Sequence, residues 1–71
     1  MLLIDCPFDF IQENKTRVKS LNTGSEGVVV GKEHGIKGDV KDDWKDDFHV
    51  RWDNGNESAI WRIWGKDIEV I

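Results

Sequence analysis

The stretch DFHVRWDNGNESAIW, residues 47–61, decides the fold class of this chain. Its first half alternates apolar with polar residues, which places Phe48, Val50 and Trp52 on one face of a β-strand. The Asn-Gly pair at 54–55 separates this strand from a second short one. Such a pair is typical of a two-residue type I′ turn, because both central residues of that turn need a positive φ. The sequence therefore predicts a tight β-hairpin with one apolar face.

Further short strands are predicted on both sides of the hairpin. Residues 16–20 alternate polar with apolar side chains, residues 26–32 are β-branched and bounded by glycine, and residues 67–71 form a closing strand. Residues 62–66 are expected to form a helical turn that ends at a glycine. The fold class is thus mainly β. Five short strands predict a small barrel, because closure removes the exposed edges of a sheet.

Three motifs occur in the order found in a known family of barrels. Residues 24–30, GSEGVVV, are similar to the G-x-x-G-x-V core of KOW motifs, in which the second glycine lets the chain bend into the second strand. Residues 50–55, VRWDNG, resemble the hairpin of mind-bomb-type domains and of several small bacterial and phage proteins. Residues 65–70 resemble the helical turn and last strand of the same barrels. Residues 16–71 therefore resemble an SH3-like barrel of the KOW, Tudor and mind-bomb kind, which implies binding of peptides, proteins or RNA rather than catalysis.

The length limits what the chain can do. With 71 residues, of which 38% are hydrophobic, it can form one small core and has little room for a substrate cavity. This argues against most enzymes. We expect residues 1–15 to form an N-terminal extension packed on a barrel of residues 16–71, and we expect the chain to be a complete short gene product.

Cysteine usage and hydropathy predict a cytoplasmic protein without membrane contact. The single cysteine, Cys6, cannot form an internal disulfide, which suits a reducing compartment. No apolar run approaches the ~20 residues that a membrane-spanning helix needs. The opening apolar residues form too short a run for a signal peptide and lack a basic flank.

A long exposed acidic loop is predicted over residues 33–47. The pattern Lys-Asp-Asp-aromatic occurs twice in succession, at 41–44 and 45–48. One interpretation is a loop that grips a basic partner, with Trp44 as the anchor, because tryptophan is favoured at interface hot spots and charges steer approach. The alternative is a solvated loop with Trp44 folded back on the barrel. The predicted partner-binding residues of this loop are Asp39, Asp42, Asp43, Trp44, Asp46 and Asp47.

Two further tryptophans are predicted to join this surface. Trp61 and Trp64 are three residues apart and share one face if their segment is helical. The resemblance to Tudor domains implies that Trp44, Trp61 and Trp64 form a wall for a methylated cation by cation–π attraction. The alternative is that Trp61 and Trp64 pack against residues 1–14.

The leading hypothesis is a non-enzymatic protein-binding module with a basic protein partner. It suits a phage or mobile-element protein that modulates a host factor, with the aspartates of the loop imitating phosphates. The rival hypothesis is a KOW-like nucleic-acid or ribonucleoprotein contact on the outer strand face. The net charge of −4 argues against unselective binding to phosphates, and pairing across the sheet with Glu26 and Glu57 would also explain these basic residues. The basic strip of the rival hypothesis consists of Lys15, Arg17, Lys19, Lys32, Arg51 and Arg62.

Neither a metal, nor a cofactor, nor a catalytic residue is predicted. Cys6, His34 and His49 are the soft ligands of the chain, and no two of them have metal-ligand spacing. A pair formed by Cys6 and His49 stays open on sequence alone, but nothing supplies a third orienting group. The crowded aspartates lack the order of a calcium loop.

Overall fold

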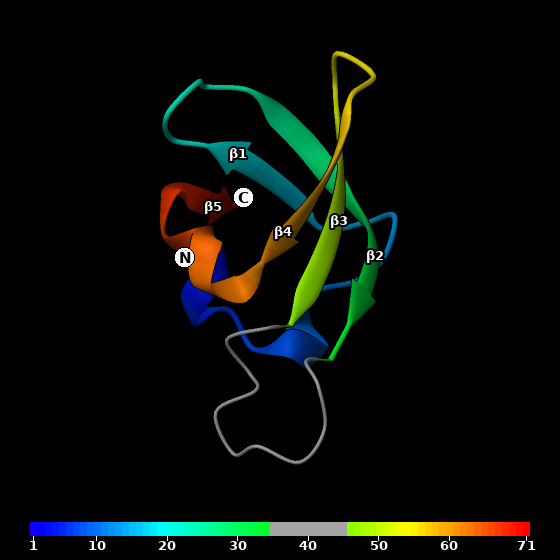
Figure 1. The fold of residues 1–71 in the computed structure, drawn as a ribbon, viewed down its shortest axis with the longest axis vertical. Helices are drawn as coiled ribbons and strands as arrows, with labels where there is room; N and C mark the ends of the chain where they lie inside the picture. The colour runs from blue at the N-terminus through cyan, green and yellow to red at the C-terminus, as the bar shows by residue number, and fades with distance from the viewer. Residues whose placement is uncertain (35–45) are drawn as a thin grey trace.

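The computed structural model describes residues 1–34 and 46–71 and has a mainly β fold. One antiparallel sheet contains five strands in the order β4-β3-β2-β1-β5 (Figure 1). This confirms the predicted fold class and the number of strands. Among the described residues no pairing joins β4 to β5, so the sheet is not closed by hydrogen bonds. The strands are β1 (Arg17–Ser20), β2 (Glu26–Glu33), β3 (Asp47–Trp52), β4 (Glu57–Trp61) and β5 (Ile68–Val70).

Short 3₁₀ helices flank the sheet. The segment before β1 contains η1 (Leu3–Asp5) and η2 (Phe8–Phe10), and η4 (Arg62–Asp67) connects β4 to β5. The predicted helical turn before the last strand is therefore confirmed and extends to residue 67. None of the helices in the described part of the chain has the length and apolar character needed to cross a membrane.

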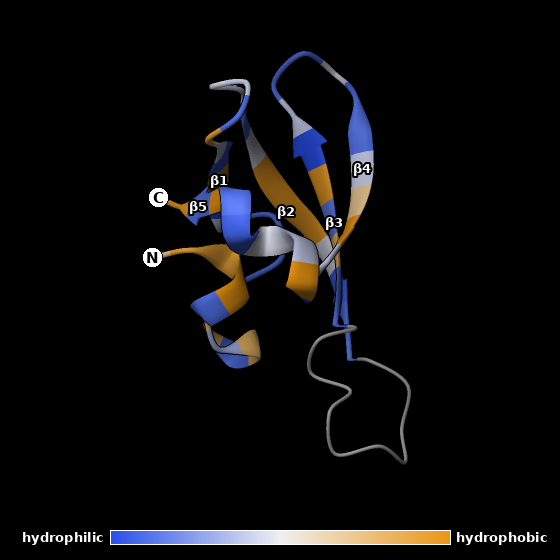
Figure 2. Ribbon diagram, turned by 60° about the vertical axis from the view of Figure 1, so that its left-hand side comes forward, coloured by the Kyte–Doolittle hydropathy of each residue, from blue (hydrophilic) through white to orange (hydrophobic). Residues whose placement is uncertain are grey.

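The core receives side chains from both the sheet and the N-terminal segment. The alternation of β3 buries Phe48 and Val50, as predicted, and Trp52 is half-buried and packs against the same cluster. Hydrophobic stretches of β2, β3 and the N-terminal segment are coloured orange in Figure 2, and these segments contribute residues to one core cluster. Because both segments share one core, residues 1–11 support the sheet. The buried apolar residues are Leu3, Cys6, Ile11, Val18, Val29, Phe48, Val50 and Ile68.

The β3–β4 hairpin is confirmed, but the predicted type I′ turn is wrong. Gly55 has a φ of 93°, whereas Asn54 is not among the residues with positive φ. The Asn54 side-chain oxygen instead accepts a hydrogen bond from the Asn56 N–H at 3.0 Å. This local bond stabilises an Asx-type turn, in which one glycine takes the left-handed conformation. The backbone N–H of Trp52 still bonds to the carbonyl of Asn56, so the strands stay in register.

The N-terminal segment lies along β5 and η4. Leu2 forms a β-bridge with Glu69, and the Val70 N–H donates to the carbonyl of Met1 at 2.7 Å. Gly65 of η4 lies so close to η1 that an added Cβ would be 2.8 Å from the Cβ of Leu3. These contacts cover the outer edge of β5. The division at residue 15 stays a prediction.

Candidate functional site

Trp61 and Trp64 form a stacked, solvent-exposed pair at the junction of β4 and η4. Their ring centroids are 5.2 Å apart and the rings are inclined by 13°. Trp61 is 43% exposed and Trp64 is 59% exposed. The 3₁₀ geometry explains the pairing, because residues three apart lie on the same side of such a helix. The predicted shared face is therefore confirmed, and neither tryptophan belongs to the buried core. The alternative, in which both pack against residues 1–14, stays a prediction.

The buried residues of η4 determine which of its residues face the solvent. Arg62 and Gly65 face the interior, and the absence of a side chain at Gly65 lets η4 lie directly on η1. With residues 62 and 65 inward, residues 61 and 64 are turned outward. The stacked pair is thus a consequence of how the helix is anchored.

An acidic row leads up to Trp61 across the outer face of the sheet. Glu33 pairs with Asp47, and Asp47 pairs with Trp61, so the three side chains lie on one face of β2, β3 and β4. Asp47 is half-buried, and within the described part of the chain its Oδ1 atom is buried without a hydrogen-bond partner. Such an acceptor is costly unless a donor reaches it. The row therefore places negative charge directly beside an exposed indole.

A second exposed apolar area lies on the other side of η4. Ile63 is 40% exposed. It borders a hollow of about 360 Å³ that Ile4, Asp5 and Arg62 also line. Apolar side chains are thus exposed on two sides of η4.

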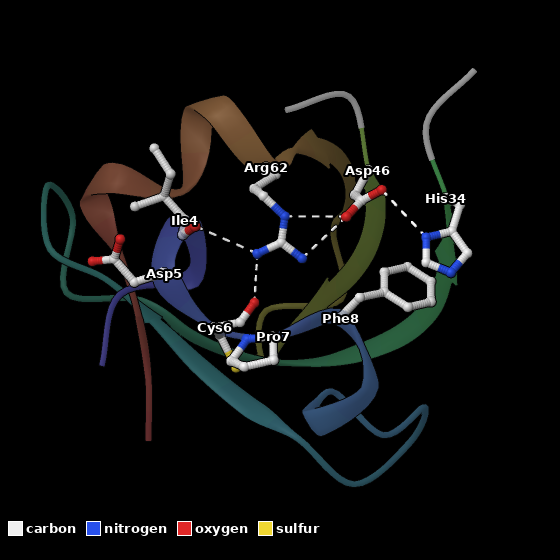
Figure 3. A pocket seen from close by; sticks show the side chains of 8 residues that line it. All are labelled: Ile4, Asp5, Cys6, Pro7, Phe8, His34, Asp46 and Arg62. Atoms are coloured by element: carbon white, nitrogen blue, oxygen red, sulfur yellow. Dashed lines mark hydrogen bonds and ion pairs between the residues drawn. The ribbon is translucent and has the colours of Figure 1, made fainter. Parts of the chain in front are cut away.

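The predicted exposure of Asp46 and Arg62 is wrong. Both are buried, at 2% and 8% exposure, and an Nη of Arg62 lies 3.1 Å from Oδ2 of Asp46. The same guanidinium donates to the backbone carbonyl of Leu3. It also donates to the carbonyls of Ile4 and Cys6 (Figure 3). Asp46 therefore does not belong to an exposed acidic loop, and Arg62 does not belong to an outer basic strip.

The pocket around this ion pair is closed on one side by aromatic rings. His34 stacks on Phe8 with centroids 3.8 Å apart, and its Nδ1 atom lies 3.6 Å from Oδ1 of Asp46 (Figure 3). Cys6 and Pro7 also line this pocket, beside Phe8. The guanidinium of Arg62 contacts the Asp46 carboxylate and also donates to backbone carbonyls of the N-terminal segment. This ion pair therefore holds the N-terminal segment onto the sheet.

The remaining basic residues do not form one free strip. Arg17 lies 2.9 Å from Asp53 and 3.8 Å from Glu26. Lys32 does not face outward with them: its ammonium lies 4.4 Å from the centre of the Phe8 ring and donates to the Phe8 carbonyl.

Arg51 also has an acidic neighbour, because its guanidinium lies 3.7 Å from Glu57. Lys15 is exposed and Lys19 is half-buried. Cross-strand pairing with Glu26 and Glu57, the alternative interpretation of these residues, is thus present for Arg17 and Arg51.

Four predicted partner-binding residues, Asp39, Asp42, Asp43 and Trp44, lie outside the described residues, and their roles stay predictions. Within residues 1–34 and 46–71, no group of three or more His, Cys, Asp and Glu side chains is arranged to hold a metal ion. Cys6 is buried in the core, whereas His49 is exposed on the outer face of β3.

Sequence reasoning missed the ion pair between Asp46 and Arg62, although a signal was present. Extending the alternation of β3 and β4 by one residue each turns both side chains inward, with Phe48 and Ile60. The acidic row was missed because it depends on strand register. Comparisons with models of protein families, with curated proteins and with solved structures found no match.

Proposed function

We propose that this chain is a small SH3-like barrel without catalytic activity that binds a protein partner through its exposed tryptophan pair. The barrel is supported by the five-stranded antiparallel sheet and by the 3₁₀ helix that precedes its last strand. The family resemblance is part of the proposal, whereas the strand order leaves the sheet open between β4 and β5 in the described part of the chain. A barrel of this kind offers a rigid base from which a few side chains project.

One observation carries the binding function, namely the stacked and exposed pair of Trp61 and Trp64. Tryptophan is the residue most enriched at interface hot spots, because its large rigid ring buries much apolar area with little loss of conformational entropy. A fold of this size has few apolar residues to spare, yet it leaves two indoles in solvent. Covering the pair with a partner would remove that area from water.

The charge beside the tryptophans supports a basic partner. Glu33 and Asp47 lie in the row that ends at Trp61, and the whole chain carries a net charge of −4. A lysine or arginine side chain placed over an indole gains cation–π attraction and is also drawn to the two carboxylates. The expected partner therefore presents a basic segment, as in the hypothesis of a phage or mobile-element modulator of a host factor.

Binding of a fluorescent oligolysine peptide, followed by anisotropy, tests this function. We expect binding to the wild-type chain and none with an oligoglutamate peptide of equal length. Replacing Trp61 and Trp64 by alanine should weaken oligolysine binding about tenfold or more, since each indole contributes as a hot spot. The matched control is the double substitution Phe10→Ala and Leu21→Ala, which removes two exposed apolar side chains outside η4. Equal affinity of both double variants would contradict the proposal.

A further inference from the structure

The outer edge of β4 has backbone groups that face away from β3. Hydrogen bonds connect Trp52 with Asn56 and Arg62 with Asp46. In an antiparallel ladder these bonded pairs alternate with non-bonded pairs. Residues 57, 59 and 61 are therefore in the non-bonded pairs, and their N–H groups point outward.

This edge is open in the described part of the chain. Glu57, Ala59 and Trp61 are all exposed, and β4 ends the sheet. Within residues 1–34 and 46–71, no strand pairs with the outer edge of β4 and no hydrogen bond involves its three outward N–H groups. The opposite edge of the sheet differs, because Met1 and Leu2 lie along β5.

We propose that the partner binds by adding an extended segment to the β4 edge, with a lysine or arginine opposite Trp61. This inference rests on the proposed function and specifies how the partner engages the same surface. Strand addition provides backbone hydrogen bonds, and the side chains of alternate residues provide the specificity. The occupant is thus a basic, extended segment of another protein.

Charge complementarity decides for this occupant. A residue opposite Trp61 on the outer face extends the row that already contains Glu33 and Asp47. Its side chain projects from the same face as Trp61, and Asp47 lies on the second strand from it, about two strand spacings or roughly 10 Å away. A lysine or arginine at this position lies over the Trp61 ring and is drawn toward the carboxylates of the row. A second copy of this chain would instead bring another acidic surface.

The outer face has room for such a segment. Two residues along β4 from Trp61, the cross-strand row on the outer face consists of Gly31, His49 and Ala59. The neighbours of the histidine in this row are thus a glycine and an alanine. Beyond it, Arg51 and Glu57 pair with each other at 3.7 Å. Ala59 at the centre of the edge offers little steric hindrance to an approaching strand.

Two matched peptides test the inference by NMR titration of the labelled full chain. Both peptides alternate lysine with threonine. In one peptide the backbone nitrogens of the lysines carry a methyl group, and in the other the backbone nitrogens of the threonines do. With lysines on the outer face, the lysine N–H groups point to β4 and the threonine N–H groups point away. We expect the threonine-methylated peptide to bind and to shift the amide signals of Glu57, Ala59 and Trp61. The lysine-methylated peptide should bind about tenfold more weakly or worse, because it lacks the ladder donors.

The substitution Ala59→Pro adds a test on the protein side. It removes an N–H that no ladder bond within the sheet uses, and proline is tolerated at such edge positions. We expect a folded variant that has lost affinity for the threonine-methylated peptide about as strongly as the peptide methylation does. Should this variant unfold, the two peptides still decide the matter with the wild-type chain.

The possible failures are distinguishable. Equal binding of both peptides, with loss of binding in the Trp61→Ala/Trp64→Ala variant, would overturn strand addition and leave the proposed function intact. Binding that does not depend on the tryptophans would overturn both. Binding of oligolysine alone, with neither alternating peptide bound, would overturn strand addition. A dimer in sedimentation experiments that Ala59→Pro dissociates would show that a second copy occupies the edge.

Discussion

The guanidinium of Arg62 and the carboxylate of Asp46 form a buried ion pair at the point where β4 ends and β3 begins. The Nε atom and one Nη atom of Arg62 both lie 3.1 Å from Oδ2 of Asp46. The other Nη atom donates to carbonyls of residues 3, 4 and 6. One side chain thus connects the sheet to the N-terminal segment, and the close approach of Gly65 to Leu3 adds a second contact between η4 and η1.

Replacing Arg62 by alanine should destabilise the protein strongly. The change leaves Asp46 buried without its cation and three backbone carbonyls without their donor, and breaking a buried pair in this way costs about 3–5 kcal/mol. The matched control is Arg51→Ala, which removes an exposed pair with Glu57 and should cost less than about 1 kcal/mol. Urea unfolding of both variants measures the difference. Similar midpoints for the two variants would show that the Arg62 pair is not structural.

Leu3 is expected to be as important for stability as a residue of the sheet. Its side chain is fully buried against η4, so Leu3→Ala should cost about 2–5 kcal/mol. Leu21, which is 51% exposed, provides the control, and Leu21→Ala should change the stability by less than about 0.5 kcal/mol. Thermal unfolding followed by circular dichroism compares the two. If Leu3→Ala and Leu21→Ala have the same melting temperature, the packing of residues 1–11 against the sheet is wrong.

Two glycines of β2 should respond differently to alanine. A Cβ at Gly27 would lie 2.6 Å from the carbonyl oxygen of Arg51, whereas a Cβ at Gly31 would meet no atom closer than 3.6 Å. Gly27→Ala must therefore push β3 away and should cost about 1–3 kcal/mol. Gly31→Ala should be neutral or stabilising by roughly 0.5 kcal/mol, because alanine restricts the unfolded chain. Denaturant midpoints of the pair test this, and a reversed order would refute the close approach at Gly27.

Binding to nucleic acid should be weak and should not define the function. Carboxylates lie beside Arg17 and Arg51, Lys32 is held over a phenylalanine ring, and Arg62 is buried. A labelled single-stranded RNA should accordingly show no strong binding at low salt. The rival hypothesis predicts affinity that falls steeply as salt rises, and also loss of that affinity in Lys15→Glu and Lys19→Glu. Observing both would favour the rival.

The strands were predictable because each follows a simple pattern. The alternation in β3 and the β-branched residues of β2 set the inward face. The helical turn before β5 was also predicted, but Gly65 lies within η4 and does not end it. The turn type was not predictable, because a side-chain hydrogen bond of Asn54 decides it. Nor was the face of Lys32, since β2 has a register shift between Val29 and Gly31. An extra residue at that point changes which face the following side chains occupy.

The candidate site was predictable only in part. The shared face of Trp61 and Trp64 follows from their spacing. Asp46 and Arg62 were assigned to the surface by residue type, and their burial depends on a partner 16 residues away. The acidic row depends on the register of three strands, which spacing along the chain does not reveal.

The two edges of the sheet are not equivalent in the described part of the chain, because Met1 and Leu2 cover β5 whereas no described strand covers β4. Stacking of identical copies edge to edge would need both a free donor edge and a free acceptor edge on every molecule. The described part of this chain offers one free edge, the edge of β4, so assembly would stop after one copy had been added. Loosening the Leu2–Glu69 bridge would restore the missing edge and turn a self-limiting module into one that is able to polymerise into fibres.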